Sequence, residues 1–104
     1  MKKQTITLRQ PVTLHDKRIT ELTFREPSGG QYLDIGEPRM LARNVDGTLY
    51  WVEDREAIKR YVDACVDHEF GGPIIRILGL ADAKLAKDTV LGFFTTADQE
   101  TSSA

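Results

Sequence analysis

The fold is decided by the stretch Ile19-Thr20-Glu21-Leu22-Thr23-Phe24-Arg25-Glu26-Pro27-Ser28-Gly29-Gly30. Within it, Leu22 and Phe24 alternate with polar residues, and a period of two turns one face of a strand toward a core. Glu26-Pro27 ends the alternation, because proline lacks an amide hydrogen and favours an extended residue before it. The small residues 28–30 tolerate a positive φ, so we expect the chain to reverse there.

Residues 4–14 supply the hairpin partner of this strand. The apolar side chains of this segment occupy even positions, namely Ile6, Leu8, Val12 and Leu14. Pro11 interrupts the segment, so we expect either one edge strand or two short strands. The short polar run His15-Asp16-Lys17 suits a hairpin turn into residues 18–25.

One residue of the deciding stretch has the wrong parity for a regular strand. Ile19 is apolar, yet it lies three positions before Leu22 and would face the opposite side. A β-bulge near Thr20 would bring both side chains onto the apolar face.

A second hairpin is expected around Asp46-Gly47, because this dipeptide between apolar runs is a strong signal for a tight turn. We place its strands at residues 40–45 and 48–52. Trp51 in the second strand has two interpretations. It is either a ligand platform or an aromatic packed in the core or the sheet, and we favour the packed aromatic.

Residues 54–68 form the clearest helix. Asp54 is a good N-cap. One apolar stripe runs through Ile58, Tyr61, Val62, Cys65 and Val66. Gly71-Gly72 ends the helix, and Pro73 suits the first position of the next element. Residues 31–43 show no continuous helical pattern, since glycine and proline interrupt them.

The C-terminal part combines an apolar run with a final helix. Residues 74–80 are apolar nearly all round, which indicates either the buried centre of the domain or a partner interface. We expect Asp82 to cap a helix that ends near Thr95, with Gly92 beneath a close neighbour. The polar residues 98–104 are expected to form a disordered tail.

The length predicts a single domain over residues 1–97. The patterns described above make it an α+β domain, with N-terminal antiparallel β-hairpins followed by two to three C-terminal helices. With a formal net charge of -2, the sequence shows no excess of basic residues of the kind that binds nucleic acid. No apolar run reaches the roughly 18 residues of a membrane span, and no signal peptide is recognisable. Cys65 is the single cysteine, which suits a reducing cytoplasm.

No catalytic, cofactor-binding or metal-binding site is predicted. Cys65 and His68 are three positions apart, but Cys65 belongs to the apolar stripe, where an inert buried thiol is expected. Asp63, Asp67 and Glu69 read as an acidic helix flank, because a metal site needs a denser set of ligands. No phosphate-binding glycine loop occurs either.

Three segments resemble a known family. They are Leu8-Arg9-Gln10-Pro11, then the strand motif Ile-x-Glu-Leu-x-x-Arg-Glu-Pro at residues 19–27, and finally Gly79-Leu80 with Phe93-Phe94. Their order is similar to that in the tail assembly chaperones of Mu-like contractile-tailed phages and related prophages. The resemblance covers both ends of the chain, whereas the Asp46-Gly47 hairpin lies outside the pattern.

The resemblance implies a non-enzymatic helper in the cytoplasm of a bacterial host. It would bind the tape measure protein during tail assembly and be absent from the mature virion. Alternatives are a structural phage tail, virion or adaptor protein, and a small enzyme or ligand-binding module around Trp51, His68 or Cys65.

An apolar surface is what a helical client would need. The candidate residues for partner binding are Ile74, Ile75, Ile77, Leu78, Leu85, Phe93 and Phe94. The same residues could instead form the core of the domain, or the contact of a homo-oligomer.

Overall fold

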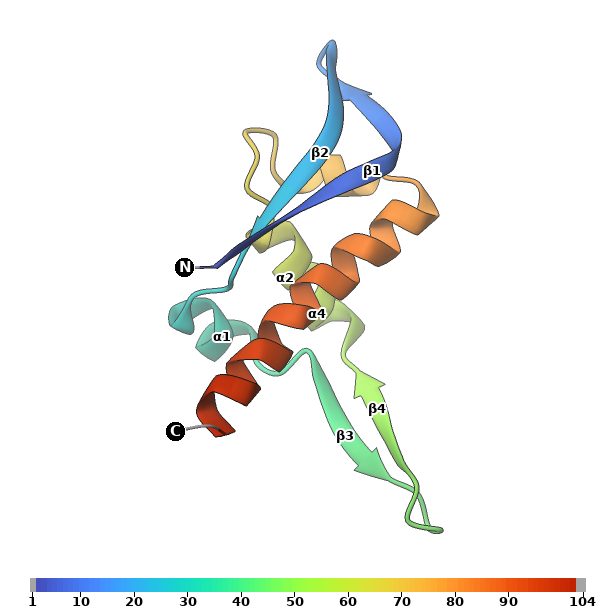
Figure 1. The fold of residues 1–104 in the computed structure, drawn as a ribbon, viewed down its shortest axis with the longest axis vertical. Helices are drawn as coiled ribbons and strands as arrows, with labels where there is room; N and C mark the ends of the chain where they lie inside the picture. Colours follow the sequence, from blue (N-terminus) through green and yellow to red (C-terminus); the bar gives the residue numbers. More distant parts are fainter. Residues whose placement is uncertain (1, 103–104) are drawn as a thin grey trace.

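Two antiparallel hairpins and four helices make up the computed structural model, which describes residues 2–102 (Figure 1). The elements are β1 (Lys3–Leu14), β2 (Lys17–Arg25), α1 (Gly29–Ile35), β3 (Arg39–Arg43), β4 (Leu49–Glu53), α2 (Arg55–Cys65), α3 (Gly72–Arg76) and α4 (Leu80–Ser102). The predicted α+β class is confirmed, with both hairpins preceding the three C-terminal helices. Helix α1, between the hairpins, was not predicted.

The β1–β2 hairpin has the register irregularity that the parity of Ile19 required. Thr7 pairs with Glu21 and Val12 pairs with Ile19, so the extra residues of β1 lie opposite Thr20. The shift lets Ile19 share the buried face with the other apolar residues of β2. The turn at residues 15 and 16 has positive φ at both positions, 51° and 62°, which matches the twist of a tight hairpin.

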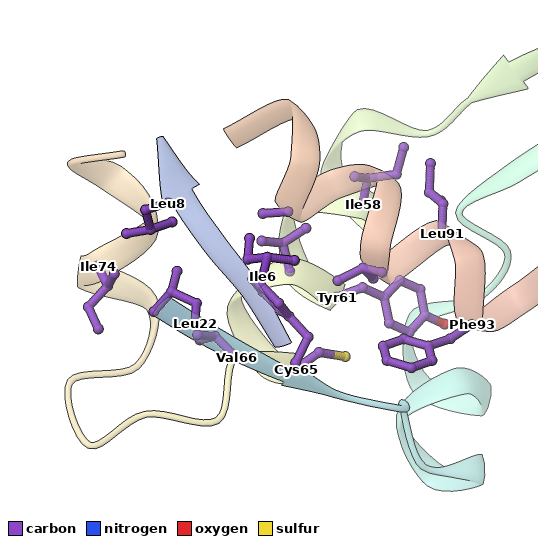
Figure 2. Packing of buried hydrophobic residues seen from close by; sticks show 14 of the residues in the cluster. Ile6, Leu8, Leu22, Ile58, Tyr61, Cys65, Val66, Ile74, Leu91 and Phe93 are labelled. Atoms are coloured by element: carbon purple, nitrogen blue, oxygen red, sulfur yellow. The ribbon is translucent and has the colours of Figure 1, made fainter. Parts of the chain in front are cut away.

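The core lies between the β1–β2 hairpin and helices α2 and α4 (Figure 2). Its fully buried side chains include Leu22, Phe24, Tyr61, Cys65, Ile74, Ala86 and Val90. The five residues of the predicted apolar stripe are all buried, but the helix is shorter than predicted, because α2 ends at Cys65 and Val66 is its C-cap. Asp54 caps this helix, and its carboxylate accepts the amide of Ala57 at 3.1 Å.

Asp82 fastens α4 to the irregular part of β1. Its carboxylate is 1% exposed and accepts the backbone amides of Arg9, at 2.9 Å, and Gln10, at 3.0 Å. Both amides lie in the segment of β1 that has no regular partner on β2. The expectation that Asp82 caps its own helix is therefore wrong. The carboxylate instead satisfies strand amides that the register shift leaves unpaired.

Helix α1 begins with a reciprocal cap. The hydroxyl of Ser28 accepts the amide of Gln31 at 3.1 Å, and the side chain of Gln31 accepts the amide of Ser28 at 2.9 Å. This capping box satisfies amides at the helix start. The expected chain reversal at residues 28–30 is thus the first turn of a helix, which Gly36 ends with a φ of 93°.

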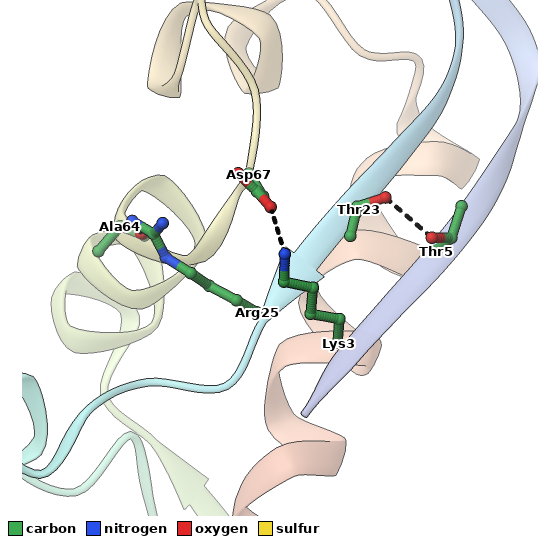
Figure 3. A network of polar contacts seen from close by, with 6 residues as sticks. All are labelled: Lys3, Thr5, Thr23, Arg25, Ala64 and Asp67. Atoms are coloured by element: carbon green, nitrogen blue, oxygen red, sulfur yellow. Dashed lines mark hydrogen bonds and ion pairs between the residues drawn. The ribbon is translucent and has the colours of Figure 1, made fainter. Parts of the chain in front are cut away.

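The chain that leaves α2 runs beside β2. Val66 bridges to Phe24, and the amide of Asp67 donates to the carbonyl of Thr23 at 2.7 Å. Figure 3 shows the polar face of the hairpin here, where Lys3 lies 3.2 Å from the Asp67 carboxylate. Exposed ion pairs of this kind contribute little to stability, so the main-chain contacts are the stronger link.

The last helix is longer than predicted. Helix α4 continues to Ser102, beyond the expected end near Thr95. The final two residues of the expected tail, 103–104, lie outside the described residues. Pro73 is the second residue of α3, one position after the predicted one, and lies in the first turn of the helix.

Candidate partner-binding surface

The β3–β4 hairpin projects from the body of the molecule (Figure 1). It lengthens the long axis to 52 Å, against 30 and 23 Å in the other directions. Two side-chain contacts join its base to α4. Arg39 donates to the Thr95 hydroxyl at 3.0 Å, and Lys87 lies 2.8 Å from the Glu53 carboxylate. The hairpin therefore has a fixed root and a free outer part.

The turn of this hairpin follows the predicted pattern. The amide of Asn44 donates to the carbonyl of Thr48 at 2.8 Å, and the Asp46 carboxylate accepts the amide of Thr48 at 2.9 Å. Gly47 has a φ of 89°, a conformation that favours glycine. The predicted hairpin at Asp46-Gly47 is confirmed.

Both faces of the projecting hairpin are apolar and exposed. Its large hydrophobic residues, each between 43% and 110% exposed, are Met40, Leu41, Val45, Leu49, Tyr50, Trp51 and Val52. Because side chains alternate along a strand, Met40, Tyr50 and Val52 share one face. Leu41 and Trp51 share the other. Exposed apolar patches of this kind mark interaction surfaces.

Trp51 lies on the sheet but is not packed in a core. Its side chain is 53% exposed. The guanidinium of Arg39 lies 4.2 Å from the centre of its ring, which is a cation–π contact. Trp51 is therefore a sheet aromatic, as one of the two favoured environments had it, but it is not in the core, and about half of its surface is available to a partner.

A groove of about 840 Å³ lies at the base of the hairpin. Met40 and Val52 line it from the hairpin, Ile35 lines it from α1, and Glu37 and Glu56 are among its charged lining residues. The groove continues the face that carries Met40 and Val52. Together, the seven exposed hairpin residues and this groove form what we call the hairpin surface.

The seven residues predicted to bind a partner differ in how far they are exposed. Ile74 and Phe93 are buried in the core. Half-buried and packed against it are Ile75, Leu78 and Phe94. Ile77 and Leu85 are exposed, at 43% and 40%. In this structure only these last two offer substantial surface to a partner.

The sequence contains a signal for the hairpin surface that alternation alone does not reveal. Residues 49–52 are consecutive apolar residues in a strand, so both of its faces are apolar. A two-stranded hairpin of a small domain cannot be covered by the core on both sides. Such a run beside a strong turn signal could have indicated an exposed apolar surface.

A second groove, of about 490 Å³, lies between the start of β1 and α4. Lys3 and Gln4 line it from the strand, and Asp88, Thr89 and Gly92 line it from the helix. A Cβ atom built at Gly92 would meet nothing within 4 Å. The expectation that Gly92 lies beneath a close neighbour is therefore wrong.

Cys65 and His68 have different environments in this structure. The thiol of Cys65 is buried, and burial raises its pKa to about 11 although Arg25 acts in the opposite direction. His68 Nδ1 accepts the backbone amide of Phe70 at 3.2 Å. Across residues 2–102, no cluster of three or more His, Cys, Asp and Glu side chains has a metal-binding arrangement.

No helix within the described part of the chain combines the length and apolar character needed to cross a membrane. Comparisons with protein-family models, with curated proteins and with solved structures give no significant match to this chain. What the molecule does must therefore be inferred from its own surface and from its sequence motifs.

Proposed function

We propose that this protein is a non-catalytic assembly chaperone that binds another protein chain through the hairpin surface. The observation that carries the proposal is the projecting hairpin with exposed apolar side chains on both faces. The strand motif at residues 19–27 supports one particular role, that of a phage tail assembly chaperone acting on the tape measure protein. It would act in the cytoplasm of the bacterial host and be absent from the mature virion.

The hairpin surface has the chemistry that a helix-rich client requires. An amphipathic helix binds by laying its apolar stripe against an apolar groove. Met40 and Val52 offer such a stripe a face that leads into the groove beside Ile35. Because these side chains are already exposed in the free protein, binding needs no rearrangement of the core.

A second candidate function is that of a structural tail or adaptor protein. The unpaired edges of the β3–β4 hairpin favour this alternative, because a free strand edge is a template for another strand. Mass spectrometry of purified virions separates the two functions. The chaperone should be missing from mature particles, whereas an adaptor should be present in them.

Co-expression with the tape measure protein of the same phage or prophage tests the proposal. The chaperone should raise the soluble fraction of the tape measure protein and elute with it as one complex. The double variant Met40→Ser/Val52→Ser should lose both effects. A protein that forms no complex at micromolar concentration would contradict the proposal.

A matched control is available on the other side of the molecule. Ile77 and Leu85 are 43% and 40% exposed, close to the 43% of Val52. Ile77→Ser/Leu85→Ser removes similar apolar surface from the residue after α3 and from α4, and should leave binding intact. If the control alone loses binding, the client occupies the C-terminal helices instead of the hairpin.

A further inference from the structure

We infer that the free edge of β4 pairs with β4 of a second copy of this chain. The two hairpins would then form one four-stranded antiparallel sheet with a two-fold axis at Trp51. This inference goes beyond the proposed function, because the pairing involves no client.

The hydrogen-bond pattern of the hairpin shows which groups lie on its free edges. The amide of Asn44 donates to Thr48, and the amide of Asp54 donates to Pro38, both at 2.8 Å. Hydrogen-bonded pairs alternate in an antiparallel ladder, so Tyr50 and Val52 direct their main-chain groups toward β3. The main-chain groups of the residues between and beside them point outward. On β4 these are Leu49, Trp51 and Glu53.

The edges of the other hairpin are partly occupied. Asp82 takes the amides of Arg9 and Gln10 on β1, and Val66 bridges to Phe24 on β2. Among residues 2–102, no strand or bridge pairs with the outer edge of β3 or β4. Unpaired edges of this kind readily accept a further strand.

Charge decides which of the two edges can pair with itself. A symmetric pairing of β3 about Leu41 would place Arg39 opposite Arg43 of the second copy. Like charges directly opposite one another destabilise a sheet. The edge of β3 is therefore protected against the symmetric pairing that uses its full length.

The edge of β4 has the opposite character. A symmetric pairing about Trp51 places the two Trp51 residues opposite each other, Tyr50 opposite Val52, and Leu49 opposite Glu53. No like charges meet, and aromatic and β-branched cross-strand pairs are favourable. This axis also makes the outward amides and carbonyls of the strand face one another, as a hydrogen-bonded pair requires.

In this arrangement the bodies of the two molecules lie at opposite ends of the shared sheet. Strand β4 runs from the hairpin tip toward the body (Figure 1), so an antiparallel second copy has its body beyond the tip of the first. Lys87 and Arg39 hold the root of each hairpin against α4. Because both copies use the same edge, the contact closes at a dimer.

Sedimentation velocity of the purified protein tests the inference without any client. The wild-type chain should show a monomer–dimer equilibrium in the micromolar range, as expected for a small interface. Trp51→Glu and Trp51→Lys should each be monomeric, since each places like charges on the two-fold axis. An equimolar mixture of the two variants should form the dimer again.

The matched controls are Leu41→Glu and Leu41→Lys. Leu41 pairs directly with Trp51 across the hairpin but lies on the edge of β3, so both controls should remain dimeric. Protection of the Tyr50 and Val52 amides from hydrogen exchange verifies that each hairpin is still folded. A monomeric wild type, dimeric single variants at Trp51, a mixture that stays monomeric, or monomeric Leu41 controls would each overturn the inference. A wild-type protein that dimerises but does not bind the tape measure protein would contradict the proposed function alone and leave this inference standing.

Discussion

The phenol of Tyr61 donates a hydrogen bond to the carbonyl oxygen of Gly36 at 2.6 Å. Tyr61 belongs to α2 and is fully buried, with the ring of Phe94 edge-on at 4.9 Å. Gly36 begins the short connection from α1 to β3. This hydrogen bond therefore ties the start of the connection that leads to the projecting hairpin to the core.

Tyr61→Phe should lower the free energy of unfolding by about 1 kcal/mol, because it removes one hydrogen bond and keeps the ring. Burial raises the pKa of Tyr61 to about 12, above its ordinary value of 10.0. The neutral phenol thus stabilises the wild type below pH 10, and this contribution is lost as the pH rises toward 12. Urea titrations at neutral and alkaline pH measure both effects. Tyr50→Phe, on the exposed hairpin, is the control and should change neither.

Acid should weaken the attachment of α4 through Asp82. The amides of Arg9 and Gln10 hold the pKa of Asp82 below its ordinary value of 3.8. Because the folded pKa is the lower one, the contribution is present above the ordinary value and is lost as the pH falls through the folded pKa.

Asp82→Asn should therefore lower the urea midpoint at neutral pH and flatten the acid dependence of stability. The amide group of the new side chain would bring a donor toward strand amides that need acceptors. Asp88→Asn, on an exposed position of the same helix, should behave like the wild type. If both variants show the same acid profile, Asp82 does not govern the acid response.

Gly92→Ala should stabilise the protein by about 1 kcal/mol, the difference in helix propensity between the two residues. A methyl group at this position of α4 meets no atom within 4 Å. Gly47→Ala is the matched control, since it also enters open space but has a φ of 89° and should destabilise. Chemical denaturation curves of both variants give the two signs. A loss of stability in Gly92→Ala would show that the helix is strained there.

Cys65 should be unreactive toward a thiol reagent in the folded protein. With a pKa of about 11, roughly a thousandth of the molecules would carry the thiolate near pH 8 even if the reagent could reach it. The same reagent should modify the protein stoichiometrically in urea, which serves as the internal control. Rapid modification without denaturant would mean that the C-terminal turn of α2 opens locally.

Local patterns in the sequence predicted the elements whose structure depends on neighbours along the chain. The alternation of Leu22 and Phe24, the Asp46-Gly47 turn and the Asp54 cap each describe a segment that needs no distant contact to be recognised. The parity of Ile19 even located the register shift. Such features follow from strand and helix periods and from turn chemistry.

The features that were missed depend on other signals. Helix α1 starts at glycines that suggest a turn, and the Ser28–Gln31 capping box was the cue for a helix. Asp82 bonds to a strand far away in sequence, which no local pattern specifies. The exposure of Trp51 depends on how the rest of the domain is arranged, so its residue type could not decide between the core and an open sheet.

The bond between Asp82 and Arg9 joins positions 73 residues apart, and this spacing has a consequence for synthesis. The ribosome makes the β1–β2 hairpin well before the helix α4 that packs against its apolar face. At ordinary translation rates, the 23 residues of α4 take roughly one to five seconds to appear. During that interval the hairpin can pack against α2 but not against α4, so the core is completed only after α4 has been made.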